Sequence, residues 1–173
     1  DKIFGVAVDV GSTTVAAHLC NLTSGDVVAS AGLMNPQIRF GEDLMSRVSY
    51  VMMNPGGEKE MTAVIREALN TLASQVATEA KIELTDILEI VLVGNPVMHH
   101  FFLGIDPTEL GGAPFALAVS GAVKGKTSDI GIPLNAGARL YIVPCIAGHV
   151  GADAAAATLS EGPDRQDDMM LLV

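Results

Sequence analysis

The segment Asp9–Thr14 (Asp-Val-Gly-Ser-Thr-Thr) holds residue types suited to phosphate and metal chemistry. Gly11 lets a backbone approach a ligand closely, and the N–H groups from Ser12 to Thr14 can form an anion-binding concavity. Asp9 follows an apolar stretch and is placed to meet a divalent cation, which we expect to be Mg²⁺ held through water. The segment therefore predicts a site for phosphate with magnesium, while a hairpin with Ser and Thr in its turn is the alternative.

A second segment, Pro144–Asp153, leads into the alanine run Ala154–Ala157. A helix faced with Ala and Gly lets another backbone pack at short distance, as a hinge between two half-domains requires; a core helix of high propensity is the alternative. Asp153 is a candidate for orienting an attacking water or completing a Mg²⁺ shell, or it serves only the first turn of its helix. His149 is a candidate for reaching a cleft.

A third group lies between the first strands and the first long helix. Asp43, Ser46 and Arg47 share one face of a predicted helix by their i, i+3, i+4 spacing, and Gln37 and Arg39 precede them. One interpretation is that these residues contact a ligand or a partner at a cleft. The other is that they form a network of caps and ion pairs that pins the neighbouring loop.

Asn95 and Pro96 mark the start of another helix, with Asn as the N-cap and Pro in the first turn. We count Asn95 among the candidate cleft contacts. His99 and His100 follow on that helix, but neighbouring helical positions point about 100° apart. We therefore expect core or interface histidines rather than a shared metal.

Composition narrows the class of protein. The 173 residues include 49% hydrophobic, 17% charged and 4% aromatic side chains, with 10 Lys and Arg against 20 Asp and Glu. A net charge of −10 gives no electrostatic reason to bind nucleic acid or an anionic membrane. The mean hydropathy is +0.41, yet no apolar run approaches the ~18 residues of a membrane span. Cys20 and Cys145 form no metal-binding motif, and we expect a cytoplasmic protein.

The hydrophobic pattern predicts an α/β fold with a mixed sheet, in which an antiparallel three-strand meander is followed by helix–strand units. The predicted strands are Ile3–Val10, Thr14–Leu22, Asp26–Met34, Glu89–Gly94, Arg139–Val143 and Met169–Val173, with weak strands at Phe115–Val119 and near Ile130. The predicted helices are Gly41–Met53, Glu58–Ala80, one from Asn95 to Gly104, and Gly148–Ser160. The strand Glu89–Gly94 follows a long helix and should run parallel to the first. We treat residues 1–173 as one domain, with 107–138 as an insertion or a β-extension.

The two ends predict a fragment. The chain starts on Asp1 without an initiator Met, enters a strand at once, and stops on the apolar run Met169–Val173. We expect these residues to belong to a longer protein.

The order of these segments resembles the first half of the acetate/sugar kinase, heat-shock protein and actin superfamily, whose domains have a ribonuclease H-like fold. The resemblance implies a half-domain of an actin-like ATPase clamp. It makes Gly11, Ser12, Thr13 and Thr14 the first phosphate loop, with Asp9 and Asp153 as catalytic residues and Asp9 near Mg²⁺ of MgATP or MgADP. Gly148–Leu159 becomes the connecting helix, and Met169–Val173 the strand that leads to a second phosphate loop outside this chain.

A closer resemblance rests on four segments: Gly5–Thr14, Asn35–Arg47 (NPQIRFGEDLMSR), Val93–Pro107 (VGNPVMHHFFLGIDP) and Pro144–Ala157. They are similar to the reductive activators of corrinoid proteins, and the match runs essentially from end to end. The resemblance implies ATP-dependent reduction of Co(II) corrinoid to Co(I) on a corrinoid protein of a methyltransferase system. It also implies a 2Fe–2S domain in the parent protein, with no cluster bound by this chain.

Two other functions stay open. A small-molecule kinase of the same fold would use Asp43 or Asp153 as a base toward a substrate hydroxyl. A nucleotide-gated, actin-like scaffold would bind other subunits, and a homodimer is one candidate assembly. On any of these hypotheses the isolated 173 residues are expected to be inactive, because half of the nucleotide contacts are missing.

Overall fold

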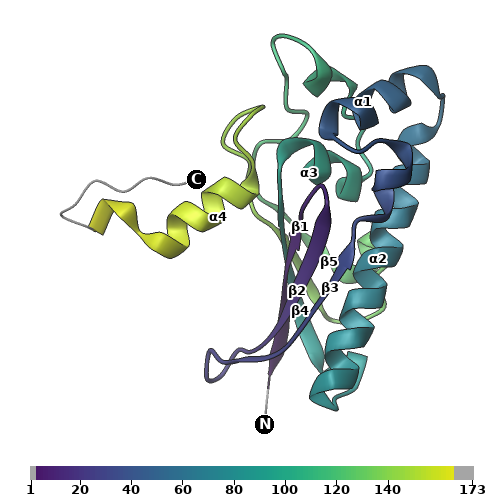
Figure 1. The fold of residues 1–173 in the computed structure, drawn as a ribbon. Helices are drawn as coiled ribbons and strands as arrows, with labels where there is room; N and C mark the ends of the chain where they lie inside the picture. Colours follow the sequence, from purple (N-terminus) through teal and green to yellow (C-terminus); the bar gives the residue numbers. More distant parts are fainter. Residues whose placement is uncertain (1–2, 166–173) are drawn as a thin grey trace.

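The computed structural model describes residues 3–165, which form one mixed sheet with its helices (Figure 1). The strands are β1 (Phe4–Val10), β2 (Thr14–Asn21), β3 (Val27–Met34), β4 (Ile87–Gly94), β5 (Val123–Lys126) and β6 (Arg139–Ile142). The α-helices are α1 (Leu44–Met53), α2 (Gly57–Ala80), α3 (Pro96–Leu103) and α4 (Ala152–Glu161). Short 3-10 helices cover Pro36–Phe40, Leu84–Asp86, Thr108–Gly111, Thr127–Ile130 and Pro163–Arg165.

The sheet has the strand order β3-β2-β1-β4-β6-β5. β1, β2 and β3 pair antiparallel, β1, β4 and β6 run parallel, and β5 closes the edge antiparallel to β6. The predicted fold class is confirmed, as is the parallel pairing of the strand that follows the long helix. Because β1, β4 and β6 run parallel, their carboxyl ends lie at the same edge of the sheet.

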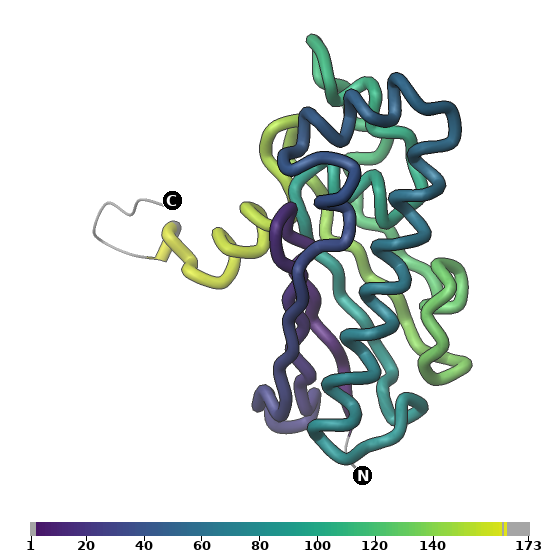
Figure 2. Tube along the Cα trace, turned by 45° about the vertical axis from the view of Figure 1, so that its right-hand side comes forward, coloured from purple at the N-terminus to yellow at the C-terminus, as the bar shows by residue number. Residues whose placement is uncertain are grey.

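The core lies between one face of the sheet and α2, which runs along that face (Figures 1 and 2). Along α2 a stripe at helical spacing is fully buried, as the periodicity of the sequence predicts: Met61, Ile65, Leu69, Leu72 and Val76. In β1 the side chains alternate, with Val8 and Val10 buried while Ala7 and Asp9 are exposed. Asp9 therefore points to the sheet face opposite the core.

The helix α1 begins later than predicted. The expected helix Gly41–Met53 starts at Leu44, because the Asp43 side chain accepts the Ser46 N–H at 2.8 Å and the Ser46 hydroxyl lies 3.2 Å from the Asp43 nitrogen. This reciprocal cap fixes the first turn. The preceding Pro36–Phe40 forms a 3-10 helix, whose N-cap Asn35 accepts the Gln37 N–H.

The helix expected to begin at Gly148 is also shorter at its start. The N–H groups of Ile146 and Ala147 both donate to the Val150 carbonyl, which closes a tight turn. α4 begins only at Ala152, after Gly151. The strand expected at Met169–Val173 lies outside the described residues.

The segment 107–138 is a β-extension, one of the two predicted alternatives, but its two weak strands were placed wrongly. Phe115–Val119 is not a strand, since Phe115 has φ of 58° and packs its ring on that of His149 at 4.2 Å between centroids. Ile130 belongs to a 3-10 helix, and the strand of this segment is β5, which lies between the two predicted positions. β5 pairs with β6, so the segment extends the sheet by one strand.

Candidate functional site

The loops that follow β1, β4 and β6 meet at the carboxyl edge of the three parallel strands. A side chain at Gly151 would place its Cβ 2.6 Å from the Cα of Asn95 and 2.7 Å from the carbonyl oxygen of Gly94. Only glycine fits there, so the start of α4 lies directly against the turn between β4 and α3. Ligands of open α/β sheets bind at this edge, and Asp9–Thr14 lies on it.

The loop after β1 is held from the protein interior through three consecutive carbonyl groups. Asn35 donates from its side-chain nitrogen to the Gly11 carbonyl and from its backbone N–H to the Thr13 carbonyl, both at 2.8 Å. Arg47 donates from Nη2 to the Ser12 carbonyl between them. Asn35 and Arg47 are both fully buried, so all three carbonyls point inward.

Because the carbonyl groups point inward, the N–H groups of the loop point outward. In a trans peptide the C=O of one residue and the N–H of the next point in opposite directions. The N–H groups of Ser12, Thr13 and Thr14 therefore point away from Asn35 and Arg47. Those of Ser12 and Thr13 donate to no acceptor among residues 3–165. A row of outward N–H groups is the backbone arrangement that binds anions.

Gly11 is required by the loop itself. A Cβ at Gly11 would lie 2.5 Å from the Thr14 carbonyl oxygen, which is closer than any side chain tolerates. The absence of a side chain therefore allows the loop to close on itself between β1 and β2. The glycine therefore allows the shape of the loop as well as the approach of a ligand to it.

Two carboxylates stand beside the loop. The Asp9 carboxyl is partly desolvated although the residue is exposed, and this raises its pKa; the negative charge of Asp153 raises the pKa further. Asp153 lies in the first turn of α4, where its Oδ1 accepts the Ala154 N–H at 2.8 Å. A carboxyl group whose charge is disfavoured by a neighbouring carboxylate suits a divalent cation, for which both groups would supply oxygen ligands.

The group Gln37, Arg39, Asp43, Ser46 and Arg47 does not converge on one opening. Gln37 is buried and donates to the Met61 carbonyl at 3.1 Å, and Arg39 is exposed and stacks over the Phe40 ring. Asp43 caps α1, and its hydrogen bond to the Ser46 N–H lowers the pKa of the Asp43 carboxyl. These contacts favour the interpretation in which the segment pins the loop.

Of the remaining candidates, Asn95 caps α3 by accepting the Met98 N–H at 3.0 Å and lies against Gly151. His149 is exposed and packs against Phe115. His100 is buried with Nδ1 2.8 Å from the Pro96 carbonyl, and its Nε2 accepts the Ala118 N–H. Both ring nitrogens of the buried His99 lack a partner in the described part of the chain.

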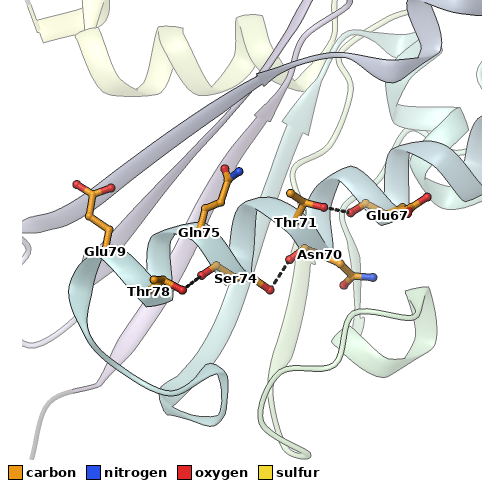
Figure 3. Close-up of a pocket in the computed structure, with 7 residues that line it drawn as sticks. All are labelled: Glu67, Asn70, Thr71, Ser74, Gln75, Thr78 and Glu79. Atoms are coloured by element: carbon orange, nitrogen blue, oxygen red, sulfur yellow. Dashed lines mark hydrogen bonds between the residues drawn. The ribbon is translucent and has the colours of Figure 1, made fainter.

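A hollow lined by residues from Glu67 to Glu79 runs along the exposed side of α2 (Figure 3). All of the side chains that line it come from this one helix. The hydroxyls of Thr71, Ser74 and Thr78 donate to carbonyls one turn earlier, so they are already satisfied. None of the residues of the loop Gly11–Thr14 lines this hollow, and its polar groups do not converge on a common point.

Among residues 3–165, no three His, Cys, Asp or Glu side chains are grouped so that they could hold a metal ion. A cation at Asp9 and Asp153 would thus take its other ligands from water or from a bound phosphate. In the same part of the chain no helix has the length and apolar character needed to cross a membrane.

Sequence reasoning missed Asn35 and Met98 as parts of the site. The Met98 sulfur lies 3.6 Å from the Asn35 side-chain nitrogen and 3.4 Å from Nη1 of Arg47, so α3 completes the support beneath the loop. Asn35 is the first residue of the motif Asn35–Arg47, directly before Pro36. Its role is not evident from the sequence, because its partners Gly11 and Thr13 lie 24 and 22 residues earlier in the chain.

Comparison with known proteins gives a consistent result. Residues 4–166 match the family model described as the RACo middle region. The chain is 34% identical over 169 residues to the corrinoid activation enzyme RamQ of Eubacterium limosum. This alignment covers 98% of this chain and 28% of RamQ. A solved structure titled reductive activator for corrinoid, iron-sulfur protein matches with a TM-score of 0.92 and 33% identity. That match covers 97% of this chain and 27% of the other, so the chain spans about a quarter of the length of each relative.

Proposed function

Because this chain belongs to the RACo middle region family, we propose that it is the nucleotide-binding part of an ATP-dependent activator of corrinoid proteins. The observation that carries this proposal is the loop Gly11–Thr14, whose three carbonyls are tied inward by Asn35 and Arg47. The loop is positioned to hold nucleotide phosphates on its outward N–H groups. The similarity to RamQ along 98% of the chain supports the corrinoid role.

In the proposed site, Asp9 would hold Mg²⁺ through water, and Asp153 would orient the attacking water or complete the shell of the cation. When bound, Mg²⁺ supplies charge stabilisation at the phosphate oxygens. The hydroxyls of Ser12, Thr13 and Thr14 add donors to the same concavity. The adenosine contacts and a second phosphate loop are proposed to lie elsewhere in the polypeptide, so that these residues are the first half of an actin-like clamp.

The proposed reaction couples two balanced steps. Water cleaves the terminal phosphoanhydride bond of ATP to give ADP and phosphate. The one electron that converts Co(II) corrinoid to Co(I) would come from the oxidation of a reduced 2Fe–2S cluster elsewhere in the polypeptide. ATP can drive the uphill transfer only if the states of the clamp differ in their affinity for the corrinoid partner. We propose a cytoplasmic corrinoid protein of a methyltransferase system as that partner.

The test is anaerobic reduction of a Co(II) corrinoid protein by the natural-length protein with a chemical reductant. We expect the Co(II) absorption to be lost, and the Co(I) spectrum to appear, only when MgATP is present. An ATP analogue whose terminal phosphate bond cannot be hydrolysed is the control. Equal reduction with and without nucleotide would refute the coupling, and absence of reduction in both cases would refute the corrinoid role.

A further inference from the structure

The buried guanidinium of Arg47 has no counter-ion in the described structure. It donates to four uncharged acceptors: the carbonyls of Gly41 and Ser12, the Gln37 side-chain oxygen and the Met98 sulfur. Burial lowers the pKa of this guanidinium, and the nearby charge of Asp43 offsets only part of that effect. Arginine still carries its charge in this setting, because no protein environment deprotonates it readily.

A buried charge without a counter-ion is costly to keep. Even a buried ion pair can often be replaced by apolar residues of similar volume without loss of stability, and Arg47 has no ion-pair partner within residues 3–165. Its hydrogen bonds hold the loop, but they do not compensate its charge. The cost is lowered when an anion binds near enough to compensate the charge.

The loop offers a place for such an anion. Arg47 contacts the carbonyl of the Ser12–Thr13 peptide, and the N–H of the same peptide points out of the opposite side. A cation on the carbonyl polarises the peptide and strengthens the N–H as a donor. The charge of Arg47 and the outward N–H groups thus both favour the binding of an anion.

We propose that Arg47 is a positioning residue that raises the affinity of the loop Gly11–Thr14 for phosphate, through the Ser12 carbonyl and through its own positive charge, which forms no ion pair within residues 3–165. The inference rests on the proposed nucleotide site and deepens it. Arg47 touches no ligand itself, because it lies on the inner side of the loop with 0% of its surface exposed. If Arg47 acts in this way, ligands should bind more tightly the more negative charge they place on the outer side of the loop.

The test compares the affinities of the natural-length protein for ADP and for adenosine, with Mg²⁺, by calorimetric titration. In Arg47→Met we expect the ratio of the two affinities to fall about tenfold or more, which corresponds to ~1.4 kcal/mol. In Arg47→Lys, which keeps the charge, we expect the ratio to stay within about threefold of the wild-type value. A purely structural role would weaken both ligands equally and leave the ratio unchanged.

Arg66→Met is the matched control, because Arg66 also donates from a partly buried guanidinium to a backbone carbonyl, that of Phe102. We expect its affinity ratio to equal that of the wild type. An unchanged ratio in Arg47→Met overturns the inference while leaving the nucleotide site intact. If that variant does not fold, Arg47→Lys decides: a retained ratio supports the role of the charge, and a tenfold loss overturns it. Failure of the wild type to bind ADP overturns the proposed function itself.

Discussion

Replacement of Asp9 by Asn is expected to abolish magnesium-dependent ATP hydrolysis while the domain remains folded. Asp9 is exposed near the end of β1, and its carboxyl group makes no hydrogen bond within residues 3–165. Its carboxyl is proposed to hold the hydrated cation that stabilises charge on the phosphate oxygens. Loss of that contribution, worth several kcal/mol at the transition state, lowers the rate ~10²–10³-fold.

The stability of the Asp9→Asn variant should match or exceed that of the wild type. The charges of Asp9 and Asp153 repel each other, which is part of the reason that the pKa of Asp9 is raised. Steady-state hydrolysis and thermal unfolding of the natural-length protein measure the two effects separately. Glu79→Gln removes one negative charge on the exposed side of α2, outside the proposed site. This control should leave the hydrolysis rate and the thermal stability unchanged. Hydrolysis by Asp9→Asn at the wild-type rate would contradict the placement of the cation.

A second large effect is expected on stability between pH 6.5 and 4, through His99. This side chain is fully buried against Phe102 and His100, and neither of its ring nitrogens has a hydrogen-bond partner in the described structure. Burial, with a smaller effect of His100, lowers the pKa of His99 to about 4. In the unfolded chain a histidine has a pKa of about 6.5.

The sign of the effect follows from proton uptake. Between pH 6.5 and 4 the unfolded chain binds a proton at His99 that the folded protein does not bind. Stability is therefore complete above about pH 6.5 and falls as the pH is lowered toward 4, by about 3 kcal/mol in total for this residue. Denaturant unfolding at a series of pH values measures this loss.

In His99→Leu this part of the pH dependence should disappear, because an apolar side chain of similar size binds no proton. His18→Leu is the control, since His18 is exposed and its Nδ1 lies 2.8 Å from the Ser30 hydroxyl. This variant keeps His99, so the loss of stability between pH 6.5 and 4 should remain. Parallel profiles for the wild type and His99→Leu would show that His99 is not the residue that titrates.

The sequence was sufficient for those parts of the fold that local patterns determine. The stripe from Met61 to Val76 specifies α2, and Asn95 with Pro96 specifies the start of α3. The turn at Gly11 was recognised because glycine between two apolar runs has few other uses. The start of α4 was placed too early, since the turn closed by the Val150 carbonyl depends on contacts that no helical propensity records.

The candidate site could be predicted on its outer side only. Residue types identified Asp9 and the loop, but Arg47 was considered for a cleft contact as readily as for support. Its actual position depends on the burial of α1 against the loop, which brings together residues 35 positions apart. Asn35 was missed for the same reason, because the carbonyls it binds have no signature in the sequence.

The most direct test of the account is hydrogen exchange of the backbone amides of the natural-length protein with and without MgADP. Phosphate on the loop should occupy the N–H groups of Ser12 and Thr13, which have no acceptor among residues 3–165. We predict that exchange of a peptide spanning residues 11–14 slows on addition of MgADP, and that adenosine produces much weaker protection. Protection by MgADP elsewhere in the protein, with the exchange of residues 11–14 unchanged, would contradict the assignment of this loop as the phosphate site.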